Sequence, residues 1–153
     1  MIKLTRHISR PKQYIVIHHC GCVCSSKNSI SWLNNISNTV QASADYFIDE
    51  VSTEVYNSDL DNYYSWHCGD GAKEPHQKVF NWNSIGIEMC NQTGPPDWLV
   101  SDKVINNTIK LVKSLQSKYN IPDSNIIFHF DVSRKNCPFP QTRARFMELF
   151  KTI

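Results

Sequence analysis

The feature that most constrains this chain is a short apolar run, YIVIH at 14–18, whose final histidine is followed directly by a second one. Its β-branched and aromatic residues predict a buried strand. An ionisable residue at the end of such a strand indicates a cleft at that edge of the sheet. His18 is therefore the first candidate functional residue, although a histidine in this position is more often a hydrogen-bonded structural residue.

Apolar runs typical of strands alternate with helical patterns along the chain, and 153 residues suit one domain. The alternation predicts an α/β fold over residues 1–153, a single domain with a central mixed β-sheet flanked by helices. Asn28 or Ser29 is expected to cap the first helix, and Ser101 or Asp102 the longest one. The predicted strands span 14–18, 44–50, 54–57, 83–90 and 126–128, and the predicted helices span 29–36, 101–119 and 141–150.

Composition excludes several classes of protein. Hydrophobic residues make up 41% of the chain and charged residues 20%, which is typical of a folded domain and not of a disordered one. No apolar run approaches the roughly 18 residues that span a bilayer, so no membrane partner is expected. The first residues, MIKLTR, lack an apolar signal core, and synthesis in the cytoplasm is therefore expected.

His129 and Cys137 are a second group of potential metal ligands, in the segment HFDVSRKNCP at 129–138. Hydrolytic zinc sites use three protein ligands and keep a fourth position open. A loop between these two residues is long enough to turn both side chains toward one ion, and His18 is well placed to be the third ligand. Two imidazoles and a thiolate suit Zn²⁺. Each residue alone also fits a structural role, since a lone cysteine is usually a small buried apolar residue.

Four segments resemble, in order, those of the phage-lysozyme-like amidases, also called amidase type 2. This superfamily includes bacteriophage endolysins, bacterial autolysins and the peptidoglycan recognition proteins. The matching segments span most of the chain. They are IVIHH at 15–19, which resembles the strand with the first zinc ligand; WHCG at 66–69; SIGIE at 84–88, which resembles the central strand; and HFDVSRKNCP at 129–138.

The resemblance implies zinc-dependent hydrolysis of the amide bond between N-acetylmuramic acid and L-alanine in bacterial peptidoglycan, in a surface cleft. It implies that His18, His129 and Cys137 bind Zn²⁺. Glu88 resembles the acid that orients or deprotonates the attacking water, and Lys135 resembles the residue that stabilises the oxyanion. A phage endolysin of this kind is expected to be made in the host cytoplasm and to act at the bacterial cell wall.

Several of these residues keep a second interpretation. Glu88 also fits a surface acid on an edge strand, and Lys135 a solvated cation. His67 is interpreted as a substrate contact or as a neighbour of the ligands, and Trp66 as core or as a wall of the substrate groove. The family pattern favours His18 over His19 as the ligand, and alternation along a strand puts these two side chains on opposite faces.

The sequence CGCVC at 20–24 has no clear role. Three thiols at this spacing suit a soft metal, but the spacing is not typical of a zinc finger. Without a signal peptide, the six cysteines are expected to be free thiols or metal ligands and not disulfides.

Two other classes of function compete with an amidase. The first is a non-catalytic peptidoglycan-binding module, but such relatives typically lose the cysteine ligand, and Cys137 is present. The second is nucleic-acid binding, because basic residues gather in 1–42 and 103–153 and acidic residues in 43–102. No basic patch interleaved with aromatic residues supports it, so peptidoglycan is the expected partner and nucleic acid is not.

Overall fold

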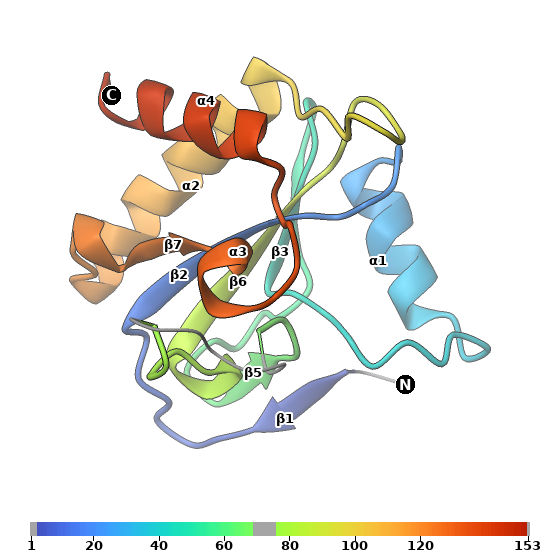
Figure 1. The fold of residues 1–153 in the computed structure, drawn as a ribbon. Helices are drawn as coiled ribbons and strands as arrows, with labels where there is room; N and C mark the ends of the chain where they lie inside the picture. The colour runs from blue at the N-terminus through green and yellow to red at the C-terminus, as the bar shows by residue number, and fades with distance from the viewer. Residues whose placement is uncertain (1–2, 69–75, 153) are drawn as a thin grey trace.

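Figure 1 shows a computed structural model, which describes residues 3–68 and 76–152. Gly69, the last residue of the WHCG segment, lies outside the described residues. In chain order the elements are β1 (Leu4–Arg6), β2 (Tyr14–His19), α1 (Ser26–Asn34), β3 (Tyr46–Ile48), β4 (Thr53–Val55), β5 (Tyr63–Ser65), η1 (Asn81–Asn83), β6 (Ser84–Met89), α2 (Asp102–Tyr119), η2 (Asp123–Asn125), β7 (Ile126–Phe128), α3 (His129–Val132) and α4 (Pro140–Phe150).

The sheet order confirms the predicted α/β fold. Five strands form one mixed sheet in the order β4-β3-β6-β2-β7. The strands β3, β6, β2 and β7 run parallel, and β4 adds an antiparallel edge through its hairpin with β3. Parallel strands direct their carboxyl ends to the same edge, so residues at the ends of β2, β6 and β7 gather there.

Alternation along the strands separates an apolar face from a functional one. Ile15 and Ile17 of β2 and Ile85 and Ile87 of β6 belong to the main core, together with the buried faces of α2 and α4. The intervening residues of β2 and β6 point to the other face. The strand register pairs His18 with Glu88, so that these two side chains lie side by side on this second face.

Helices cover both faces of the sheet, as Figure 1 shows. The helices α2 and α4 pack against each other over the main core. The helix α1 lies on the side of β3 and β4, where Leu33 packs with Ala44 and Phe47. Among the described helices, none combines the length and the apolarity that crossing a membrane requires.

Three local features differ from the sequence prediction. Helix α1 begins at Ser26 and not at Ser29, because the Ser25 side chain accepts a hydrogen bond from the backbone N–H of Asn28 and so forms the cap. The ribbon of β1 and β5 was not predicted, since strands of three residues are too short to show a period. The segment after β7 turns into α3 at once, which makes His129 the first helical residue.

Candidate metal centre and cleft

Three predicted metal ligands come together at the carboxyl ends of the parallel strands. His18 is the last residue but one of β2, His129 follows β7, and Cys137 lies in the loop before α4. Their donor atoms all lie within 4.8 Å of one another. The ring centroids of His18 and His129 are 4.4 Å apart. Both histidines are buried. The two imidazoles and the thiol of Cys137 are called the histidine cluster below.

A chain of hydrogen bonds fixes the tautomer of His18. The Ser84 hydroxyl donates to the carbonyl oxygen of Phe80 at 2.6 Å, so its oxygen accepts from Nε2 of His67 at 3.2 Å. A neutral His67 then has an unprotonated Nδ1, which accepts from Nε2 of His18 at 3.1 Å. Nδ1 of His18 is consequently left with its lone pair, as a metal ligand requires.

Burial favours the neutral form of the His18 and His67 rings. Loss of solvent, followed by the nearby His129, lowers the pKa of His18 well below its ordinary value. Burial and then Arg10 lower the pKa of His67 to about 3. Neither imidazole therefore carries a positive charge near neutral pH that would repel a metal cation, and the free nitrogen lone pair of His18 is available to bind one.

Gly86 makes room for this arrangement. A Cβ atom at this position would lie 2.6 Å from Cγ of the His67 ring, well inside van der Waals contact. The backbone of Gly86 is fixed by the fully buried Asp45, whose carboxylate accepts the Gly86 N–H at 2.8 Å. Asp45 also lies 3.7 Å from Nη2 of the buried Arg10. The buried ion pair of Arg10 and Asp45 therefore fixes the part of β6 that lies against the His67 ring.

Cys137 is held next to β2 by backbone groups. Its sulfur accepts a hydrogen bond from the backbone N–H of His19 at 3.4 Å, and the carbonyl oxygen of Cys137 accepts from the N–H of Phe130 at 2.6 Å. An N–H donor directed at sulfur favours the thiolate. Burial, with a smaller contribution from Glu88, nevertheless raises the pKa of Cys137, so a neighbouring cation would be needed to ionise it.

Glu88 is half-buried and lies beside the histidine cluster. Burial, and then Cys20, raises the pKa of its carboxyl to about 8, while Lys135 acts in the opposite direction. Within the described part of the chain, its Oε2 atom is buried and has no hydrogen-bond partner. A carboxylate oxygen in this state is costly unless a cation or a polar ligand lies close to it. The donor set and this oxygen together fit a divalent ion.

All seven predicted site residues line one cleft of about 610 Å³. They are His18, Trp66, His67, Glu88, His129, Lys135 and Cys137. Lys135 is exposed at the rim, and its backbone N–H donates to the Ser133 hydroxyl. The half-buried Trp66 donates its indole N–H to the hydroxyl of Thr5 at 2.8 Å. The cleft thus combines ligands, an acid, a cation and an aromatic side chain.

His19 lines the same cleft but does not belong to the group of candidate ligands. Its Nδ1 atom accepts a hydrogen bond from the side-chain amide of Asn91 at 3.0 Å. Its ring packs between Trp98 and Phe139. The described structure therefore brings His18, and not His19, to the other candidate ligands.

The expectation of cysteines without disulfides is wrong for one pair. Cys22 and Cys24 are joined by a disulfide, whereas Cys20, Cys68, Cys90 and Cys137 take no part in one. Sequence reasoning gave no weight to an oxidised pair separated by one residue, because the absence of a signal peptide favours reduced thiols.

Two positioning residues were not recognised from the sequence. The sequence shows Ser84 and Gly86 only as part of the SIGIE segment. In the structure, the Ser84 hydroxyl is hydrogen-bonded to the His67 ring, and Gly86 leaves the space that this ring occupies. The available signal was the run of small residues on the face that Glu88 shares, since a strand face without bulk leaves space for a side chain from elsewhere.

The fold and the donor set define an α/β domain with a candidate metal centre of the mixed nitrogen and sulfur type that zinc hydrolases use. A family model described as N-acetylmuramoyl-L-alanine amidase matches residues 8–140, and the chain belongs to this family.

Individual relatives agree with this assignment. A probable N-acetylmuramoyl-L-alanine amidase of Bacillus licheniformis is 29% identical, over 94% of this chain and 44% of its own length. The solved structure of PlyL is 26% identical, with a TM-score of 0.73 over 95% of this chain and 85% of that one. The catalytic domain of PlyG is 28% identical, with a TM-score of 0.71 over 95% and 84%. The chain spans less than half the length of the curated relatives it matches.

Proposed function

We propose that residues 1–153 form a single catalytic domain that hydrolyses the amide bond between N-acetylmuramic acid and L-alanine in bacterial peptidoglycan, with Zn²⁺ as its cofactor. Membership of the amidase family supports the reaction. The observation that carries the proposal is the histidine cluster, in which two segments far apart in the chain bring three donor atoms within 4.8 Å of one another. His18, His129 and Cys137 would hold the ion.

When bound, Zn²⁺ supplies a Lewis acid that polarises the amide carbonyl and promotes ionisation of water. The side chains of the cleft move the protons and stabilise the charge. Glu88, in its ionised form, accepts a proton from the attacking water and passes it to the leaving nitrogen. The ammonium of Lys135 stabilises negative charge on the carbonyl oxygen, and it does so more in the transition state than in the ground state.

His67 and Trp66 contribute in different ways. His67 orients the ring of His18 through the hydrogen bond between their nitrogens. His67 also lines the cleft and is therefore accessible to substrate. Trp66 offers an aromatic wall to the glycopeptide, with its indole anchored on Thr5. The proposed partner is peptidoglycan, and the proposed place of action is the bacterial cell wall, after synthesis in a host cytoplasm.

Hydrolysis of purified peptidoglycan tests the reaction. New L-alanine amino termini should appear, chelation should stop their release, and added Zn²⁺ should restore it. The appearance of reducing sugar ends in place of amino termini would identify a glycosidase and contradict the proposal.

A Cys137→Ser variant separates catalysis from binding. Loss of the thiolate ligand should abolish turnover, while the variant still sediments with insoluble cell wall, because the walls of the cleft remain. If the unmodified protein also binds cell wall without turnover, the chain is a non-catalytic binding module.

A further inference from the structure

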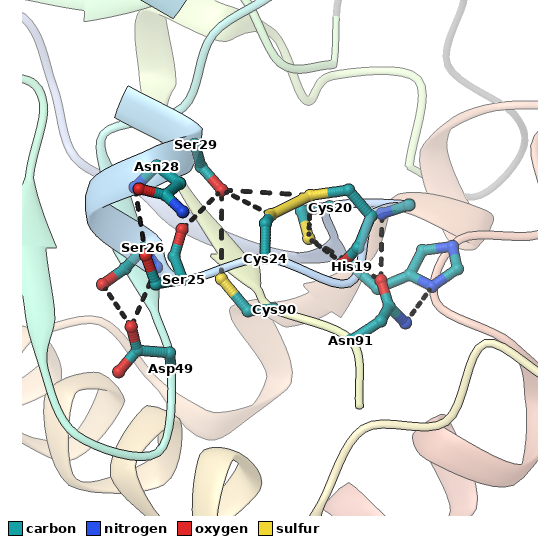
Figure 2. Close-up of a disulfide and its surroundings, with 12 residues drawn as sticks. His19, Cys20, Cys24, Ser25, Ser26, Asn28, Ser29, Asp49, Cys90 and Asn91 are labelled. Atoms are coloured by element: carbon teal, nitrogen blue, oxygen red, sulfur yellow. Dashed lines mark hydrogen bonds between the residues drawn. A yellow bond between two sulfur atoms is a disulfide. The ribbon is translucent and has the colours of Figure 1, made fainter. Parts of the chain in front are cut away.

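A second group of sulfur atoms lies beside the cleft. Cys20 follows β2 and Cys90 follows β6, and these neighbouring parallel strands pair His19 with Met89 at their ends. The loop that leads into α1 brings Cys24 close to Cys20 and Cys90 (Figure 2), and the same loop carries Cys22. Cys20, Cys22, Cys24 and Cys90 are called the cysteine cluster below.

The four sulfurs converge on one small volume. The sulfurs of Cys20, Cys24 and Cys90 all lie within 4.8 Å of one another. The sulfur of Cys22 is 3.2 Å from that of Cys20 and is bonded to that of Cys24. The Ser29 hydroxyl of α1 lies beside these sulfurs (Figure 2), and it is 3.1 Å from the Cys24 sulfur and 4.0 Å from those of Cys22 and Cys90.

Backbone hydrogen bonds hold this arrangement independently of the sulfurs. The N–H of Cys20 donates to the carbonyl oxygen of Met89, and the N–H of Gly21 donates to the side-chain oxygen of Asn91. The N–H of Asn91 donates in turn to the carbonyl oxygen of Cys22. The loop is therefore fixed to the end of β6, and the sulfur positions do not depend on the disulfide alone.

A disulfide between Cys22 and Cys24 accounts for only two of the four sulfurs. It leaves the free thiols of Cys20 and Cys90 directed at the same point. Four thiolates around Zn²⁺, each about 2.3 Å from the ion in a tetrahedron, lie about 3.8 Å from one another. The separations between sulfurs that are not bonded to each other, 3.2 Å for Cys20 and Cys22 and at most 4.8 Å among Cys20, Cys24 and Cys90, bracket this value, and reduction frees the bonded pair. A tetrahedral set of four sulfurs is typical of zinc or iron–sulfur centres.

We propose that reduced Cys20, Cys22, Cys24 and Cys90 form a second metal site, which binds a thiophilic divalent cation such as Zn²⁺ through four thiolates. A phosphine reductant breaks the Cys22–Cys24 bond, takes oxygen from water to become the phosphine oxide, and leaves two thiols. Binding of the cation then releases the four thiol protons to solvent. The disulfide and the metal are alternative states of the same loop.

The second site shares no ligand with the histidine cluster, but it borders the cleft. Its sulfurs from 20, 22 and 24 line a neighbouring cavity of about 530 Å³, and Ala42, Ser43 and Glu88 line both spaces. A cation here would fasten the loop before α1 to the end of β6, beside Glu88. Four thiolates leave no open position, so this site would stabilise structure and not bind substrate.

Metal content of the reduced protein tests the proposal. The protein is reduced with a phosphine without oxygen, loaded with Zn²⁺, passed through a desalting column and analysed for metal. We expect about two ions per chain, since each cluster holds one. The Cys137→Ser variant should keep about one ion, and X-ray absorption should show sulfur as its only neighbour.

Matched variants of the exposed loop complete the test. Cys24→Ser and Cys22→Ser should each lose about one ion while the nitrogen-coordinated ion remains, which also shows that the variants are folded. Oxidation of the unmodified protein should release the same ion. An unchanged metal content in both serine variants overturns the proposal, and so does a Cys137→Ser variant that binds no zinc after reduction. If only the histidine cluster does not bind metal, the Cys137→Ser variant still holds one ion that is coordinated by sulfur alone.

Discussion

The two clusters lie at the same edge of the sheet, yet their surroundings differ. The histidine cluster takes one donor from the end of β2 and two from the segment 129–137, far away in the chain, and it opens onto a cleft of about 610 Å³. The cysteine cluster takes three sulfurs from one loop and one from the end of β6, and its loop is fixed by backbone hydrogen bonds. Three mixed donors leave a position for a reacting molecule, whereas four thiolates leave none. Both clusters border a cavity, so the difference teaches that the number of ligands, more than the presence of cysteine, separates a reactive site from a structural one.

Three residues, Ala42, Ser43 and Glu88, line both cavities, and Glu88 is the one among them with an ionisable side chain. Among the cleft residues that are not candidate metal ligands, Glu88 should give the largest effect of substitution. Glu88→Gln keeps the shape of the side chain but removes the base, so turnover should fall by about 10²–10⁴-fold. Release of L-alanine amino termini measures this loss. Metal content of the histidine cluster should stay unchanged, and turnover within a few-fold of the unmodified protein would remove Glu88 from the mechanism.

The same substitution should raise the stability of the metal-free protein. Burial raises the pKa of Glu88 to about 8, so the folded chain holds this proton more tightly than the unfolded chain does. The contribution of this group to stability is therefore present at acidic pH and is lost as pH rises toward 8. Glu88→Gln removes that loss, and thermal unfolding at pH 8 should show a higher Tm than in the unmodified protein. An equal Tm at both acidic and alkaline pH would contradict the buried, unpartnered state of the carboxyl.

Lys135 provides the next largest effect. Lys135→Met keeps the length of the side chain and removes its charge, so kcat should fall by about 10²–10³-fold if the ammonium stabilises the oxyanion. Lys135→Arg, which retains the charge, is the matched control and should recover part of the activity. If the methionine variant changes KM and leaves kcat intact, Lys135 binds substrate uniformly and does not act on the transition state.

Much of the fold and of the site was accessible from the sequence. The strands β2, β6 and β7 are short, apolar and bounded by polar residues, so their period is visible, and the order of the matching segments places His18, Glu88 and His129 at one edge. Local patterns failed where the cause was not local. Ser25 caps α1 through a side-chain hydrogen bond that the hydrophobic period does not show.

Contacts between distant residues explain the remaining gaps. The space that Gly86 leaves for His67, and the hydroxyl of Ser84 that fixes its tautomer, depend on how a loop returns to β6. For the same reason, the sequence shows only three of the four residues of the cysteine cluster together. Cys90 follows another strand, and only the parallel pairing of β2 with β6 brings it to Cys20.

His67 gives a smaller effect that tests how the histidine cluster is oriented. His67→Phe keeps an aromatic ring over Gly86 but removes the acceptor for Nε2 of His18. Loss of such an outer hydrogen bond typically lowers metal affinity by about 10–100-fold. Competition with a chelator, in the Cys24→Ser background, measures the affinity of the histidine cluster alone. Undiminished affinity would show that packing, and not the hydrogen bond, sets the ring of His18.

The smallest effect is expected at Cys24, and it separates the two clusters most directly. Cys24→Ser removes one sulfur from the cysteine cluster without touching the histidine cluster, so turnover at 25 °C should stay within about twofold of the unmodified protein. The reduced, zinc-loaded protein should nevertheless lose thermal stability, because one fastening between the loop and β6 is gone. Release of amino termini and a thermal melt measure the two properties. A large loss of turnover with an unchanged Tm would reverse the assignment, since the cysteine cluster would then serve catalysis and not structure.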